Sequence, residues 1–289
     1  LSFTLSVLDI PGATVETFHP KAVHLYGNTL YVANDAPGHY SLEVFDVSSG
    51  NVRHVKSMVE WMNGDKKETF AGEPNGVTRS YGKIYVTNTG SRTDVFDAET
   101  YEFITCIGTG TWGEGGYQTV HAFDVTASQG AVFIRDKRKL VVVLEQDVQP
   151  GSAARVPIYS RSVNLQEAMG TYAVAARNDG FLYVTAQNKN IIYLFDPADI
   201  RAGDTGFAPY LVTLGFEKSP QSIAFVGDRL FVTLRVDDKR SELWEISPKN
   251  GKLLQDFTDL MVYPEKIAGA RHTLLVVDRA TQTVKAIGL

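Results

Sequence analysis

The amino-acid sequence predicts an all-β protein, a single six-bladed β-propeller over residues 1–289, and three observations support this. A cluster of apolar and aromatic residues recurs six times, about every 50 residues. No segment of ten or more residues shows the 3.6-residue period of a helix. The last repeat is one strand short, and residues 1–10 precede the first repeat as a candidate replacement.

Each repeat has the pattern of a small antiparallel sheet. The recurring clusters lie at 30–34, 84–88, 132–135, 182–186, 230–233 and 274–277. Before each cluster comes a short apolar strand, and a turn such as Gly27-Asn28 or Gly227-Asp228 joins the two, because these residues tolerate a positive φ. A third strand follows in most repeats and ends on an aromatic residue and an acid, as in Phe45-Asp46, and a less regular fourth strand comes next. A period near 50 residues with this chemistry predicts propeller blades.

The last repeat indicates how the ring closes. After the strand at 283–287 the chain ends, so the sixth blade lacks a fourth strand. Residues 1–10 alternate apolar with polar positions, with Leu1, Phe3, Leu5 and Val7 as the apolar set. A strand of this kind removes the open edge of the ring. We therefore predict that residues 1–10 close the sixth blade; the plainer alternative is a frayed terminal arm.

Composition narrows the class of protein. The chain has 289 residues, of which 44% are hydrophobic and 21% charged, and its net charge is −5. This charge predicts no attraction to nucleic acid, and no apolar run approaches the roughly 20 residues of a membrane helix. The single cysteine, Cys106, excludes an internal disulfide and any multi-cysteine metal site. The first residue is Leu1, from which we expect a removed leader and an extracytoplasmic location, or a trimmed chain.

Several motifs carry a resemblance to a known family. Residues 85–88 read Tyr-Val-Thr-Asn, a Gly-rich stretch at 110–116 leads toward His121, and Pro20, Pro74, Pro220 and Pro264 stand just before inner strands. In these features the chain resembles the NHL-repeat and YVTN-type propellers. The resemblance implies the architecture only, since such propellers serve as enzymes, ligand binders and scaffolds. Val120 and Thr171 stand where the pattern expects a proline.

One residue per repeat opens the inner strand, and the loops there surround the mouth of the central channel. The repeat places Lys21, Asn75, His121, Tyr172, Gln221 and Glu265 at this position. We predict that these six polar residues gather at one face around a wet channel mouth, with Glu265 adjoining Lys21 as an ion pair. The plainer interpretation is a polar ring that holds ordered water.

The sequence favours a non-catalytic binding propeller over an enzyme. We predict that the mouth residues, together with Trp112 and the basic loop of Arg135 and 137–139, form a surface that binds a small molecule, a glycan or a protein. Positive charge in these loops makes an acidic glycan or peptide a candidate ligand.

Two alternatives remain open. One is a hydrolase or lyase in which His121 and Glu265 act as acid and base, or in which a divalent metal sits at the mouth. The chain is superficially similar to gluconolactonase- and paraoxonase-type propellers, which hold a divalent cation at the channel mouth; this likeness implies Asn75 and Glu265 as calcium ligands, with Gln221 beside them. Lys21 would repel a cation at this ring position, so we expect no metal or other cofactor, with calcium as the alternative. The other is a purely structural interaction propeller.

Overall fold

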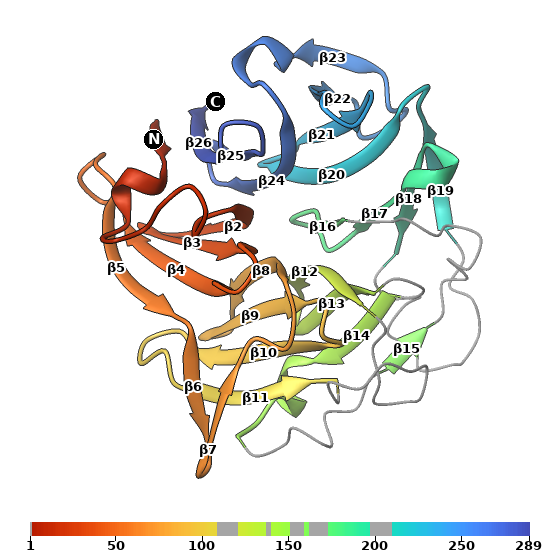
Figure 1. The fold of residues 1–289 in the computed structure, drawn as a ribbon. Coiled ribbons are helices and arrows are strands. Elements are labelled where there is room, and N and C mark those ends of the chain that lie inside the picture. The colour runs from red at the N-terminus through yellow and green to blue at the C-terminus, as the bar shows by residue number, and fades with distance from the viewer. Residues whose placement is uncertain (1, 109–120, 137–139, 151–158, 162–172, 197–209) are drawn as a thin grey trace.

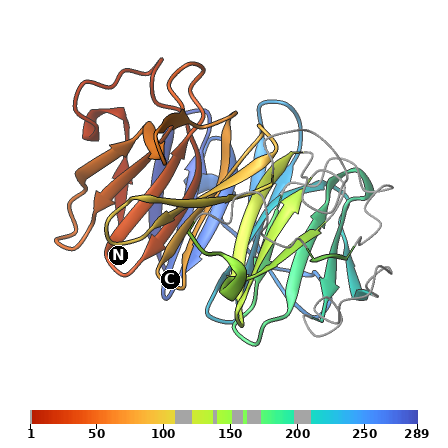
Figure 2. The ribbon, with the colours of Figure 1, turned by 90° about the horizontal axis from the view of Figure 1, so that it is seen from below.

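The computed structural model describes residues 2–108, 121–136, 140–150, 159–161, 173–196 and 210–289. Six four-stranded antiparallel sheets stand around one central axis, so the predicted six-bladed β-propeller is confirmed (Figure 1). Seen from the side, the strands of each blade run through the thickness of the ring (Figure 2). Innermost strands of successive blades contact one another around the axis. No helix in the described part of the chain is long and apolar enough to span a membrane.

The six blades follow the order of the chain. Listed from the axis outward, they are β2 (Pro20–Tyr26), β3 (Thr29–Asn34), β4 (Ser41–Asp46) and β5 (Arg53–Met58); β8 (Pro74–Ser80), β9 (Lys83–Asn88), β10 (Arg92–Asp97) and β11 (Phe103–Ile107); β12 (Ala122–Ser128), β13 (Ala131–Asp136), β14 (Leu140–Leu144) and β15 (Tyr159–Arg161); β16 (Val174–Ala176), β17 (Leu182–Ala186), β18 (Ile191–Phe195) and β19 (Tyr210–Gly215); β20 (Ser219–Val226), β21 (Arg229–Arg235), β22 (Ser241–Ile246) and β23 (Leu253–Asp256); and β24 (Pro264–Ala270), β25 (Thr273–Asp278), β26 (Thr283–Gly288) and β1 (Phe3–Leu5). Inner strands begin at one face of the ring, which we call the mouth face.

The N-terminal segment closes the ring, as predicted. Strand β1 pairs with β26, with Phe3 opposite Ala286 and Leu5 opposite Val284. The strand is shorter than the predicted 1–10, because Ser6 ends it by capping a 3₁₀ turn over Val7–Asp9. The Ser6 hydroxyl accepts the N–H of Leu8, and the Asp9 carboxylate accepts the N–H of Ser6.

Apolar layers between neighbouring blades hold the ring together. Between the first two blades, Tyr31 and Val44 pack against Val77 and Ile84, and all four are buried. An additional hairpin of β6 (Glu60–Asn63) and β7 (Lys66–Thr69) adds Trp61 to this layer. The ring of Trp61 lies 4.9 Å from those of Phe70 and Phe96, edge to face in both cases. These layers bury the repeated aromatic and aliphatic positions of the sequence motif.

A substitution in the closing strand β1 tests directly whether this strand stabilises the ring. Leu5 is fully buried, whereas Leu8, three residues later, is 91% exposed. We expect Leu5→Ala to lower the free energy of unfolding by about 3 kcal/mol, because it leaves a cavity between the sixth and first blades. Leu8→Ala is the matched control and should change it by less than about 0.5 kcal/mol. Equal losses in urea denaturation would show that β1 does not close the ring.

Candidate functional site

A bulge opens the innermost strand of five blades. In β2, Pro20 pairs with Asn34 and Ala22 with Ala33, so Lys21 has no partner in the ladder. The same shift of register occurs in β8, β12, β20 and β24. The bulged residues are Lys21, Asn75, Phe123, Gln221 and Glu265. A bulge re-aims the side chain of the inserted residue, and here all five line one cavity at the mouth face.

In the third blade, the sequence prediction of which residue opens the inner strand is wrong by two residues. Ala122, not Val120, occupies the proline position, and Phe123, not His121, is the bulged residue. His121 lies just before β12, with its ring 6.0 Å from that of Phe123, and it is not among the described residues that line the cavity. Alanine gives no sequence signal for the bulge, so the repeat was aligned two residues early. The candidates Tyr172 and Trp112 lie outside the described residues.

In two blades the threonine of the repeated motif accepts a backbone N–H at the start of the inner strand. Thr233 Oγ1 accepts the N–H of Ser222 at 3.0 Å, and Thr185 Oγ1 accepts the N–H of Ala173 at the same distance. Both N–H groups lie in the buried interior, where an unpaired donor is costly. Thr233 also donates to the carbonyl of Glu265 at 3.1 Å and so ties the fifth blade to the sixth.

Arg135 occupies this threonine position in the third blade, opposite Asp124. The sequence predicts it in an exposed basic loop, and this prediction is wrong: Arg135 lies in β13, pairs with Leu140 and is fully buried. Strand β13 runs on to Asp136, so the turn begins later than the motif indicates. Burial lowers the pKa of Arg135 to about 9, and its guanidinium donates to the Asp136 carbonyl. Residues 137–139 of the predicted basic loop lie outside the described residues.

The cavity at the mouth face, which we call the mouth cavity, has a volume of about 900 Å³. Its walls combine the five bulged residues with residues from loops and strand ends of the same face, which include Glu73, Arg235, Asp238, Lys239, Val262 and Tyr263. Lys21, Asn75, Gln221 and Glu265 therefore gather at one face, as predicted. Phe123 adds an aromatic wall that the sequence register missed. A cavity of this size and mixed character suits a small organic ligand.

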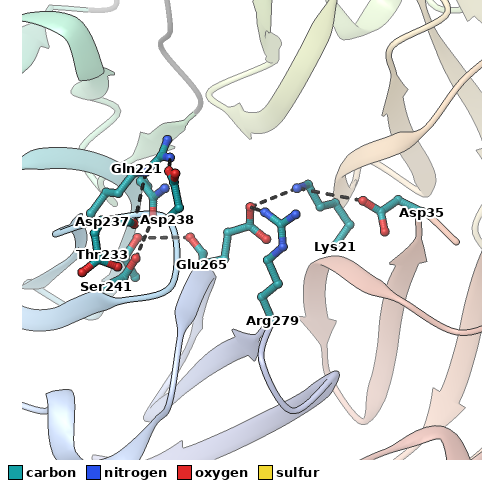
Figure 3. Close-up of polar contacts among 10 residues, drawn as sticks. Lys21, Asp35, Gln221, Thr233, Asp237, Asp238, Ser241, Glu265 and Arg279 are labelled. Atoms are coloured by element: carbon teal, nitrogen blue, oxygen red, sulfur yellow. Dashed lines mark hydrogen bonds and ion pairs between the residues drawn. The ribbon is translucent and has the colours of Figure 1, made fainter. Parts of the chain in front are cut away.

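Glu265 is the centre of an ion-pair network in the mouth cavity (Figure 3). Its Oε1 lies 3.1 Å from Lys21 Nζ, which confirms the predicted pair, and 3.1 Å from Arg279 Nη1. Lys21 also lies 3.9 Å from Asp35. Burial raises the pKa of Asp35, and Lys21 opposes this shift. On the neighbouring blade, Gln221 Oε1 accepts the Ser241 hydroxyl at 3.0 Å.

A second ion pair crosses the axis beneath the mouth cavity. Lys266 Nζ of the sixth blade lies 3.0 Å from Asp124 Oδ1 of the opposite third blade. The other oxygen of Asp124 accepts the N–H of Val174 at 3.0 Å. Residue 76 must be glycine for this approach, because a Cβ there would lie 2.8 Å from the Cα of Asp124. Burial raises the pKa of Asp124, and the ammonium of Lys266 opposes that shift.

This ion pair separates the mouth cavity from a smaller one below. Lys266 lines both spaces, and the lower cavity, of about 120 Å³, is lined by residues of the six inner strands. His24 faces the lower cavity; its Nε2 is buried and makes no hydrogen bond within the described structure. Burial lowers the pKa of His24 to about 4, and the nearby Arg79 adds to the shift. Lys266 and Asp124 thus lie between the mouth cavity and the lower one.

Comparison with known proteins supports the fold. No family model matches the sequence, and no curated protein matches it either. Among solved structures, virginiamycin B lyase from Staphylococcus aureus has a TM-score of 0.63 at 12% identity and covers 100% of this chain and 99% of its own. The β-propeller domain of Cps50 (Swd1) from Myceliophteria thermophila has a TM-score of 0.60 at 11% identity, covering 96% and 99%. A putative 6-phosphogluconolactonase from Bacteroides fragilis reaches 0.59 at 15%, covering 93% and 80%. At these identities the likeness shows the propeller fold alone.

The described residues give little support to metal binding at the mouth. No group of three or more His, Cys, Asp or Glu side chains within the described ranges is placed to hold an ion. The predicted calcium ligand Glu265 is already contacted by two cationic side chains, which occupy the place that a metal would need. The calcium alternative stays an untested prediction that these contacts disfavour.

The axial ion pair can be tested by a double-mutant cycle. Asp124→Asn leaves the buried Lys266 without an anionic partner, and we expect it to lower the free energy of unfolding by about 3–5 kcal/mol. Adding Lys266→Met removes the stranded charge, so the double variant should be less destabilised than the sum of the single variants. Additive losses in urea denaturation would mean that the two side chains are not coupled.

His24 predicts a pH dependence of stability. Its pKa is about 4 in the folded protein and about 6.5 when unfolded, so the unfolded chain binds the proton first. The stabilising contribution is complete above pH 6.5 and is lost as the pH falls toward 4, by about 3 kcal/mol. His24→Gln should remove this part of the pH profile, while the exposed His272→Gln should keep it. Identical pH profiles for both variants would contradict the assignment.

Proposed function

We propose that this protein is a binding propeller that holds a small polar organic ligand, of sugar or peptide type, in the mouth cavity without transforming it. The observation that carries the proposal is the convergence of bulged residues from five blades on one space of about 900 Å³. Amide, charged and aromatic side chains share this space, which gives a ligand both hydrogen-bond partners and an apolar wall.

The catalytic alternative has less support. Glu265 contacts two cations, an arrangement that holds the rim together, and His121 does not line the mouth cavity. These two residues therefore lack the shared space that acid–base catalysis on one substrate requires. The fold likeness to a lyase and to a putative lactonase does not choose between binding and catalysis, because unrelated activities use one fold.

The charge balance favours a polar ligand over a strongly acidic one. Most cations of the mouth cavity have a carboxylate partner: Arg279 has Glu265, Arg235 has Asp238, and Lys266 has Asp124. A polyanionic glycan would have to compete with these internal partners. A ligand with balanced charge gains from the same groups without displacing them.

The site can be tested by filling the mouth cavity. Ala280 is exposed on its rim, so Ala280→Trp places an indole in the entrance without disturbing the core. We expect polar fragments that bind the wild type in ligand-observed NMR to lose at least about tenfold in affinity. Ser49→Trp is the matched control, an exposed turn residue of the opposite face, and should bind as the wild type does. Fragments that bind the Ala280→Trp variant unchanged would remove the mouth cavity as the site.

A further inference from the structure

Two charged side chains of the mouth cavity make no ion pair within the part of the chain that the structure describes. Glu73 and Lys239 both line the mouth cavity, and neither makes an ion pair with any residue that the structure describes, in contrast to Lys21, Arg279 and Glu265. Both side chains are exposed, while their backbones are anchored. The N–H of Glu73 donates to Thr89 Oγ1 at 3.0 Å, and that of Lys239 donates to Asp237 Oδ1 at 2.8 Å.

The two unpaired charges face each other across the ring. Glu73 directly precedes β8 in the second blade, and Lys239 lies between β21 and β22 in the fifth. In a six-bladed ring the second and fifth blades are opposite (Figure 1). One side of the mouth cavity therefore offers an unneutralised carboxylate, and the other side offers an unneutralised ammonium.

Neighbouring groups add to this polarity, and Asp238, the carboxylate that lines the cavity beside Lys239, is paired with Arg235. Glu73 lies near Asp35, and the mutual repulsion of the acids helps to raise the pKa of Asp35, while Lys21 is shared between Asp35 and Glu265. On the opposite side, Arg235 lines the mouth cavity close in sequence to Lys239, and its guanidinium has donors beyond those bound to Asp238. A ligand cation would reduce the repulsion among the acids on the Glu73 side. A ligand carboxylate would be attracted to the cations on the Lys239 side.

We propose that the ligand is a zwitterion, such as an amino acid or short peptide, whose ammonium binds at Glu73 and whose carboxylate binds at Lys239. This inference rests on the proposed function, because it assigns the chemical class of the ligand to the same cavity. Internal ion pairs elsewhere in the mouth cavity disfavour a ligand with a net charge of either sign. Phe123 supplies an apolar wall between the two charged sides.

The probes for the test are unbranched ω-amino carboxylates of increasing length, from glycine to 12-aminododecanoate, titrated by calorimetry at low ionic strength. Each is compared with the monocarboxylate and the monoamine of the same chain length. We expect one length to bind best and to exceed both singly charged analogues by about fivefold, the scale of an exposed ion pair.

Charge variants then assign the two ends. Glu73→Gln should abolish the advantage over the monocarboxylate, and Lys239→Gln the advantage over the monoamine. Glu102→Gln and Lys249→Gln, which are exposed on the opposite face, are the matched controls and should keep both advantages. The double variant Glu73→Lys/Lys239→Glu should bind the zwitterion again in the reverse orientation.

The outcomes separate this inference from the proposed function. If singly charged analogues bind as well as the ω-amino carboxylate, or if none of the ω-amino carboxylates binds, the zwitterion assignment is overturned. The binding function still stands in that case, provided that Ala280→Trp weakens the fragments that do bind. If Ala280→Trp weakens no probe, the mouth cavity is not the binding site and both proposals fail.

Discussion

The bulge that opens the innermost strand of five blades is the constraint on which the mouth of this propeller depends. A bulge takes one residue out of the ladder and leaves a buried N–H that needs an acceptor. In the fifth blade, Thr233 provides that acceptor for the N–H of Ser222. The bulge also re-aims the side chain of the inserted residue, and repetition around the ring collects these residues in one cavity.

The residue that follows each bulge determines what lies beneath the mouth cavity. The residue after the bulge is Asp124 in the third blade and Lys266 in the sixth, and these two blades are opposite. Their ion pair crosses the central axis below the mouth cavity. Gly76 leaves the room that Asp124 needs, because a Cβ at residue 76 would collide with the backbone of Asp124. Buried ion pairs add little net stability over apolar packing. We therefore interpret this pair as a feature that shapes the mouth cavity rather than one that holds the fold together.

The sequence was sufficient for the fold and for part of the site. The repeat spacing identified six blades, and the alternation at Phe3 and Leu5 identified the closing strand, because a periodic pattern reports directly on burial. Lys21 and Glu265 were placed correctly because prolines mark their bulges. In the third blade Ala122 stands in place of this proline. Without a proline to mark the bulge, the repeat pattern indicates His121 instead of Phe123. The burial of Arg135 and the ion pair between Asp124 and Lys266 depend on partners far apart in sequence, which no local pattern reveals.

The central claim is that five bulged residues build a cavity at the mouth face and that an axial ion pair lies beneath it. A high-resolution crystal structure of the ligand-free protein tests it most directly. The account predicts continuous density for Lys266 reaching Asp124 across the axis, with Phe123 and Asn75 facing the space above. An open channel through the ring, with Lys266 and Asp124 turned away from each other toward water, would contradict it.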